Sequence, residues 1–125
     1  MKVTAEKNEK VANMIFGSIY PLYLNRLEKN GRTKEEFHQV IQWLTGHDEE
    51  AIQALIDEKA TFRTFFQKAE MHPNAHMIKG VVCGYRIEEI EDEFELYRQC
   101  RQMEKLIDEL ARGRKMEKIL RKEKK

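Results

Sequence analysis

Apolar residues recur at intervals of three and four along the first half of the chain, the spacing that places side chains on one face of a helix. The first such segment runs from Phe16 to Leu27, and the pair Asn30-Gly31 marks its end. Ser18 is a residue type that caps helix N-termini, and Pro21 is tolerated in a first turn. We therefore expect the first helix to begin near Ser18.

Three more segments of this kind follow, each preceded by a capping residue. Thr33 and Glu36 have the spacing of a capping box, and Gly46 is suited to end the helix that they start. Asp48 and Thr61 are placed to cap the next two helices. Because start signals, stop signals and periodicity agree, the sequence predicts four short capped helices in this half of the chain.

Two stretches interrupt the helical pattern. Residues 1–13 are polar and lack periodicity, so we expect a frayed N-terminus. His72-Pro73-Asn74 begins an irregular stretch that runs to Gly84. Within it, residues 81–83 could form a short extended segment, but no second strand is apparent with which this segment would pair.

A long helix is expected from about residue 87 to residue 111. A helix of about 20 residues is about 30 Å long and could span the whole domain. Its apolar stripe comprises Phe94, Tyr97, Cys100, Met103, Ile107 and Leu110. Leu96 and Leu106 flank this stripe. Gly113 interrupts it, a short helix follows, and residues 122–125 form a basic tail. The predicted fold is all-α: a single compact domain of five to six helices over residues 14–121, with the short capped helices packed on the long C-terminal helix.

Composition narrows the class of protein. Hydrophobic residues make up 41% of the 125 positions and charged residues 36%, a balance typical of a globular, soluble domain. No apolar run approaches the roughly 20 residues that a membrane helix needs, and the N-terminus lacks the apolar core of a signal peptide. Two cysteines, Cys83 and Cys100, are too few for a disulfide framework, so we expect a cytoplasmic protein with reduced thiols and no membrane association.

The net charge of +1 conceals a separation of charge near the C-terminus. Residues 86–111 carry 4 basic and 9 acidic side chains, whereas residues 112–125 carry 8 basic and 2 acidic ones. The basic segment could contact nucleic acid weakly, or it could be a solvated helix end. Residues 33–59 have the outline of a helix-turn-helix, but the second helix is acidic, the wrong sign for binding phosphates. Nucleic acid is therefore disfavoured as a partner.

Candidate chemistry centres on the stretch GVVCGYR at residues 80–86. Cys83 is the one candidate nucleophile, because Arg86 and an expected helix start are features that stabilise a thiolate. The alternative, which we favour, is that the valines and the cysteine form a buried plug at a crossing between helices, with a glycine on either side. His72 and His76 flank a proline and have no further ligands at suitable spacing, so we predict no metal site. No phosphate-binding loop or dinucleotide fingerprint is present, and no cofactor is expected.

Four amphipathic aromatic residues and one arginine are candidates for binding a ligand or a partner. They are Tyr20, Tyr23, Trp43, Tyr85 and Arg86.

Four blocks of the sequence resemble a bacterial family. They are YPLYLNRLEKNGRTKEE at residues 20–36, WLTGHD at 43–48, GVVCGYRIEEIED at 80–92 and KLIDELARGRKMEKILR at 105–121. In their order and spacing they resemble the domain of unknown function 2200 family over about residues 14–121. The resemblance implies a small, mostly helical bacterial cytosolic protein, and it implies no activity.

The sequence favours a non-enzymatic interaction or regulatory module, whose partner is an unknown protein or a second copy of the chain. The alternative is a small-ligand-binding protein or enzyme with a site around Cys83, Tyr85 and Arg86. A weaker alternative is nucleic-acid contact through the basic residues 112–125.

Overall fold

The computed structural model describes residues 2–121. This part of the chain contains seven α-helices: α1 (Ala5–Ala12), α2 (Phe16–Lys29), α3 (Lys34–Thr45), α4 (Glu49–Asp57), α5 (Phe62–Gln67), α6 (Glu95–Ala111) and α7 (Met116–Ile119). Three 3-10 turns and two short strands lie between α5 and α6: η1 (Ala75–Met77), β1 (Val81–Val82), β2 (Tyr85–Arg86), η2 (Ile87–Glu89) and η3 (Asp92–Phe94).

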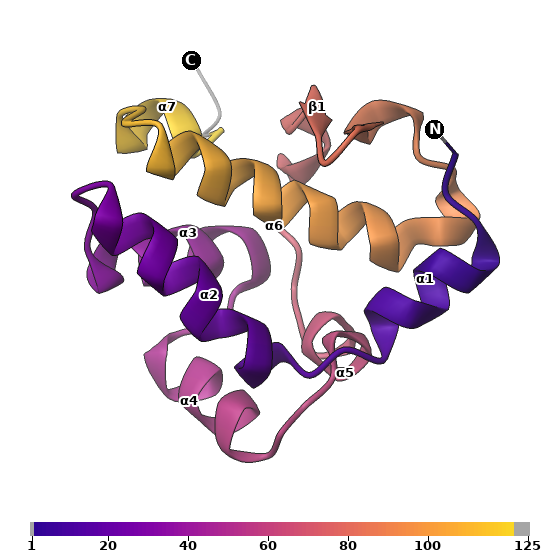
Figure 1. Cartoon of the computed structure of the whole chain (residues 1–125), viewed down its shortest axis with the longest axis horizontal. Coiled ribbons are helices and arrows are strands. Elements are labelled where there is room, and N and C mark those ends of the chain that lie inside the picture. Colours follow the sequence, from indigo (N-terminus) through magenta and orange to yellow (C-terminus); the bar gives the residue numbers. More distant parts are fainter. Residues whose placement is uncertain (1, 122–125) are drawn as a thin grey trace.

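Helix α6 is the element around which the others pack. It contacts α1, α2, α3, α5 and α7 as well as β1. In Figure 1 it crosses the molecule, with α1 and α2 below it and the strands and α7 above it. The predicted fold class, a mostly helical single domain of short helices on a long C-terminal helix, is confirmed. Within residues 2–121, none of the helices combines the length and the apolar composition that a transmembrane segment requires.

The predicted capping residues in the first half of the chain cap the helices α3, α4 and α5, as the sequence predicts. The hydroxyl of Thr33 accepts a hydrogen bond from the N–H of Glu36, and the Glu36 carboxylate accepts one from the N–H of Thr33, which completes the capping box. The side chains of Asp48 and Thr61 each accept a hydrogen bond from a backbone N–H three residues on. Gly46 ends α3 with a φ of 79°, a conformation that glycine adopts without strain.

The prediction of a frayed N-terminus was wrong, because α1 forms there and is one of the seven helices found within residues 2–121. The hydroxyl of Thr4 caps the helix, and Ala12 at its end is fully buried. The side-chain oxygen of Asn8 accepts a hydrogen bond from the N–H of Tyr97, at 3.0 Å. These stabilising contacts reach across the molecule, so the local periodicity of a polar segment does not reveal them.

The prediction that the first apolar helix begins near Ser18 was also wrong. Helix α2 begins at Phe16 and has no side-chain cap, so Ser18 lies within the helix and Pro21 lies beyond its first turn. The N–H of Phe16 donates to the carbonyl of Ala60, at 2.9 Å, in the loop before α5. A carbonyl supplied by a distant loop thus takes the role expected of a serine hydroxyl.

The long helix is shorter than predicted, but its buried face is as predicted. Every residue of the expected stripe is buried. From Cys100 onward the stripe packs in a cluster that includes Phe16, Phe37 and Phe65, whereas Phe94 and Tyr97 pack in a second cluster with Tyr85 and Ile90. Burying a side chain of this size contributes about 1.5–3 kcal/mol, so the buried face of α6 makes a large contribution to the stability of the fold. Residues 87–94 keep the helical spacing of buried residues, but they do so in single 3-10 turns before α6 begins.

Candidate functional site

Residues 81–86 form a β-hairpin, not a crossing between helices. Strands β1 and β2 pair antiparallel, with Val82 opposite Tyr85. Cys83 and Gly84 form the connecting turn with φ values of 53° and 83°, and a positive φ at both positions is the requirement of a type I′ turn. A second strand therefore does exist. It was missed because a cysteine occupies the turn position where asparagine or aspartate usually signals a hairpin.

Cys83 lies exposed at the tip of this hairpin, so the predicted buried plug is wrong for this residue, although Val82 beneath it is buried. The thiol points toward Glu104 of α6, with 3.6 Å between Sγ and Oε1. Partial burial and the negative charge of Glu104 raise the pKa of the thiol. Arg86, the expected activating cation, lies instead against two acidic side chains of η2, at 3.7 and 3.9 Å.

A polar network lies behind Cys83, between α6, α2 and the hairpin. Arg101 donates hydrogen bonds to Glu104 and to the hydroxyl of Tyr97, the latter at 2.8 Å. The hydroxyl of Tyr23 donates to the second oxygen of Glu104, at 2.8 Å. The guanidinium of Arg101 also lies over the rings of Tyr97 and Tyr85, with its Cζ 4.6 and 5.9 Å from their centroids, distances at which a cation is attracted to an aromatic face.

The network extends to α1 through Lys7, whose ammonium donates to the hydroxyl of Tyr85 at 2.7 Å. This hydrogen bond lowers the pKa of Tyr85, whereas burial raises the pKa of Tyr23. The structure therefore brings three sequence candidates, Tyr23, Cys83 and Tyr85, to one place.

Sequence reasoning missed the two residues at the centre of that network, Arg101 and Glu104. The available signal was an arginine and a glutamate three residues apart beside the buried stripe of the long helix. Such a pair is also typical of an exposed ion pair.

The remaining aromatic candidates lie elsewhere and support the core. The hydroxyl of Tyr20 meets Nε2 of His38, and its ring stacks on Phe37. Trp43 stacks on His72 with 4.2 Å between ring centroids. No three histidine, cysteine or acidic side chains within residues 2–121 are grouped so that they could hold a metal ion.

A cleft of about 400 Å³ separates the first half of α6 from the segments that precede it. Its apolar wall comes from Met71, Ala75, Ile78 and Ile87. Three carboxylates, those of Glu88, Asp92 and Glu95, line it together with His76 and Arg98. The cleft therefore combines an apolar surface with an excess of negative charge.

Gln102 is the one buried polar residue in this lining, with 6% of its surface exposed. Its Nε2 donates to the carbonyl of Ala75 at 3.3 Å. Its Oε1 accepts no hydrogen bond from any residue between 2 and 121. This oxygen is not among the fully buried side-chain atoms that lack a partner within the described residues, so it is accessible and can accept a hydrogen bond from a ligand donor.

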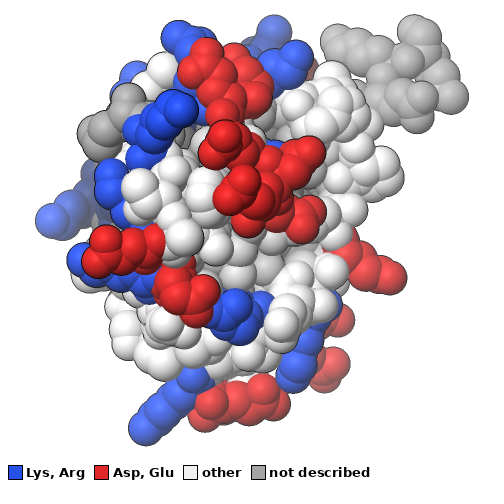
Figure 2. Space-filling model, turned by 90° about the vertical axis from the view of Figure 1, so that its right-hand side faces the viewer, with Lys and Arg blue, Asp and Glu red and all other residues white. Residues whose placement is uncertain are grey.

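The cleft opens on an acidic face, in which all six carboxylates of residues 88–95 are exposed. Figure 2 shows red side chains gathered on the side of the molecule that carries the start of α6. Asp92 is paired with Arg98 at 2.8 Å. A hydrogen bond from the N–H of Gly80 lowers the pKa of Glu88. Glu95 forms no ion pair with the part of the chain that the structure describes.

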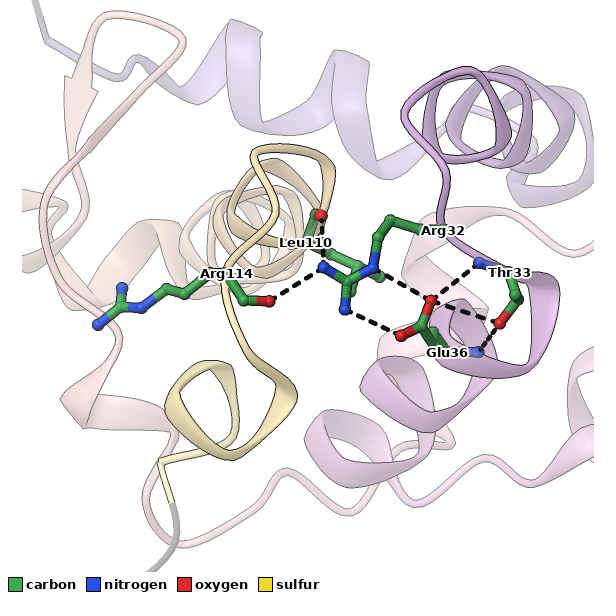
Figure 3. A network of polar contacts seen from close by, with 5 residues as sticks. All are labelled: Arg32, Thr33, Glu36, Leu110 and Arg114. Carbon is green, nitrogen blue, oxygen red and sulfur yellow. Dashed lines mark hydrogen bonds and ion pairs between the residues drawn. The ribbon is translucent and has the colours of Figure 1, made fainter.

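The residues that follow α6 are anchored on the protein through Arg32, the residue before the α3 cap (Figure 3). Its guanidinium donates to the carbonyls of Leu110 and Arg114, at 3.3 and 3.0 Å, and to both carboxylate oxygens of Glu36. One side chain therefore joins the start of α3 to the end of α6.

The basic segment after α6 is partly neutralised by the acidic end of that helix. Glu109, a buried carboxylate, receives two hydrogen bonds from Arg121, at 2.7 and 2.9 Å, and an ion pair from Arg114 at 3.0 Å. Arg112 lies 3.0 Å from Asp108. Three arginines that could have contacted phosphates are thus engaged within the fold. The basic tail at residues 122–125 lies outside the described residues.

Comparison with known proteins gives a family and a fold. The model of a family described as "Uncharacterized protein conserved in bacteria (DUF2200)" matches residues 10–121. A solved structure titled "Crystal structure of uncharacterized protein SP1917" is 35% identical in sequence and superposes with a TM-score of 0.83. The match covers 93% of this chain and 97% of that chain. No curated protein matches.

Proposed function

The chain belongs to the DUF2200 family of uncharacterised bacterial proteins, and we propose that it is a non-enzymatic interaction module that binds a basic segment of a partner protein in the cleft beside α6. The observation that carries this proposal is the composition of the cleft, in which an apolar wall of four side chains lies beside three carboxylates. The cleft also opens on an exposed acidic face.

The two parts of the cleft have different roles in this proposal. Apolar contact with Ile78 and Ile87 supplies affinity, because buried apolar anchors dominate most interfaces. The carboxylates attract basic segments and repel acidic ones, which favours fast association and selects the partner. Arg98 is paired with Asp92, so the carboxylates of Glu88 and Glu95 carry the remaining negative charge of the cleft.

An enzyme built around Cys83, the alternative from the sequence, draws less support. A catalytic thiol is held as a thiolate by neighbouring cations or a helix N-terminus. The carboxylate of Glu104 beside Cys83 has the opposite effect, since it contributes to raising the pKa of the thiol.

Selection of peptides on the immobilised protein tests the proposal. A library of random twelve-residue peptides would be selected against the wild-type chain and against the variant Glu88→Gln/Glu95→Gln. We expect the wild type to enrich peptides that combine lysine or arginine with at least one apolar residue. The cleft variant should lose most of this enrichment, because two of the three carboxylates lining the cleft are gone.

The matched control removes two carboxylates outside the cleft, in Glu6→Gln/Glu50→Gln, since both are exposed and form no ion pair with residues 2–121. This variant should select the same peptides as the wild type. The proposal fails if no peptide is enriched, or if both double variants select the same peptides as the wild type.

A further inference from the structure

We infer that the cleft recognises the ammonium group of a lysine side chain of the partner protein, through the amide oxygen of Gln102 and the carboxylates of Glu88 and Glu95. This inference rests on the proposed interaction function and names the chemical group that the cleft selects.

The position of Gln102 is the first argument. Residues 95, 98, 99 and 102 line the cleft at helical spacing, so one face of α6 forms its wall. On that face, Gln102 is buried while Glu95 is exposed. A ligand side chain that enters past Glu95 therefore reaches Gln102, whose amide oxygen has no hydrogen-bond partner among the described residues.

The shape of the ligand follows from the rest of the lining. Ile78 and Ile87 provide an apolar surface for an aliphatic stem, and lysine side chains bury their methylene groups in this way while the charged end stays hydrogen-bonded. The three acceptors belong to different side chains on η2 and α6. Three separate acceptors suit the three rotatable donors of an ammonium, whereas a guanidinium favours the paired oxygens of one carboxylate.

Glu88 and Glu95 are available to a ligand to different degrees. One oxygen of Glu88 accepts the N–H of Gly80 at 3.0 Å, and the other lies 3.7 Å from Arg86. This second contact is exposed and long, so a ligand ammonium can replace it at low cost. Glu95 has no ion pair to give up among the described residues.

Titration with a minimal probe tests the inference by NMR on the isotope-labelled full chain. The probe is lysine blocked at both ends, N-acetyl-lysine N-methylamide, followed through the side-chain amide of Gln102 and the methyl groups of Ile78 and Ile87. We expect saturable shifts at these groups. Blocked norleucine, which keeps the stem but lacks the ammonium, and blocked arginine should each bind about tenfold more weakly, as the loss of a charged hydrogen bond predicts.

Two variants separate the proposed contacts from a general effect on the fold. Gln102→Met keeps the length of the side chain but removes the acceptor, and we expect about tenfold weaker binding of blocked lysine. Glu95→Gln tests the same site at an exposed position where the fold is not at risk, and it should weaken binding severalfold. Gln39→Met, at an exposed glutamine on α3, is the control and should bind as the wild type does.

The outcomes also distinguish this inference from the proposed function. Enriched peptides whose binding is unaffected by Gln102→Met and Glu95→Gln would overturn the lysine site while the interaction module stands. Equal binding of blocked lysine, blocked norleucine and blocked arginine would overturn it too. Tenfold tighter binding of putrescine, a free diamine, than of blocked lysine would also overturn it, because the cleft would then select a free amine and not a lysine side chain of a protein. Peptide selection that enriches nothing would remove the interaction module itself.

Discussion

Cys83 is a residue whose reactivity depends on its neighbours more than on its exposure. The thiol is open to solvent at the hairpin tip, but partial burial and the carboxylate of Glu104 outweigh the nearby cation of Arg101, so the pKa of the thiol is raised. Because only the thiolate is nucleophilic, an exposed thiol in this setting reacts slowly at neutral pH.

We expect Cys83 to be alkylated more slowly at neutral pH than an unstructured cysteine, because partial burial and Glu104 raise its thiol pKa. The variant Glu104→Gln should lower that pKa and speed alkylation severalfold. The measurement is the alkylation rate against pH in a Cys100→Ser background. Glu93→Gln, which removes an exposed carboxylate elsewhere, should change nothing. Fast alkylation of the parent protein at neutral pH would contradict this expectation and restore the enzyme hypothesis.

Single residues also show where sequence reasoning reaches its limit. Tyr23, Cys83 and Tyr85 were recognisable as candidates because their side chains carry chemistry. Gln102 was not, because a glutamine on a helix has no distinguishing pattern until its burial and its neighbours across the cleft are known.

At the scale of elements, α6 is capped by a side chain from a distant part of the chain. Its own N-cap residue, Phe94, provides no side-chain hydrogen bond. The oxygen of Asn8 in α1 instead accepts the N–H of Tyr97, in the first turn of α6. One of the four N–H groups that a helix start leaves without an intrahelical partner is satisfied in this way.

We therefore expect Asn8→Ala to lower the free energy of unfolding by about 1 kcal/mol, as loss of a conventional N-cap does. Urea denaturation would measure the change. The control is Asn13→Ala, since Asn13 is exposed and its side chain forms no hydrogen bond within residues 2–121. Equal losses in the two variants would show that the contact between α1 and α6 contributes nothing as a cap.

The difference between caps that are local in the sequence and caps supplied by distant residues explains which elements the sequence could predict. Helices α3, α4 and α5 were placed correctly because Thr33, Asp48 and Thr61 lie next to the N–H groups that they cap. Helix α1 was missed because it is held by contacts with α6, nearly ninety residues away in the case of Asn8 and Tyr97. Local patterns cannot report such contacts.

At the scale of the whole molecule, acidic side chains of α6 connect separate parts of the chain. Glu104 binds Tyr23 of α2, Asp108 binds Arg26 of α2, and Glu109 binds Arg121 after α7. The separation of charge between residues 86–111 and 112–125 was visible in the sequence. The turn at Gly113, whose φ is 89°, determines which basic residues fold back onto that acidic helix. The sequence alone does not reveal the direction of this turn.

These ion pairs make the stability of the fold depend on pH, most clearly at Asp108. Burial opposes its ionisation, but Arg26 and Arg112 outweigh burial and lower its pKa below the usual 3.8. The folded state therefore binds this proton less readily than the unfolded state does. Its stabilising contribution is complete above about pH 5 and is lost as the pH falls through 3.8 toward the lowered folded value.

The variant Asp108→Asn should accordingly be less stable than the wild type at pH 7, and the difference should shrink as the pH falls below about 5. Urea midpoints measured between about pH 3 and pH 7 would follow this convergence. Glu93→Gln, which removes an exposed carboxylate that has no ion pair with the described residues, should run parallel to the wild type throughout. A difference between wild type and Asp108→Asn that stays constant with pH would mean that Asp108 contributes through packing and not through its charge. Convergence would instead show that the contact between α2 and α6 depends on the ionised carboxylate.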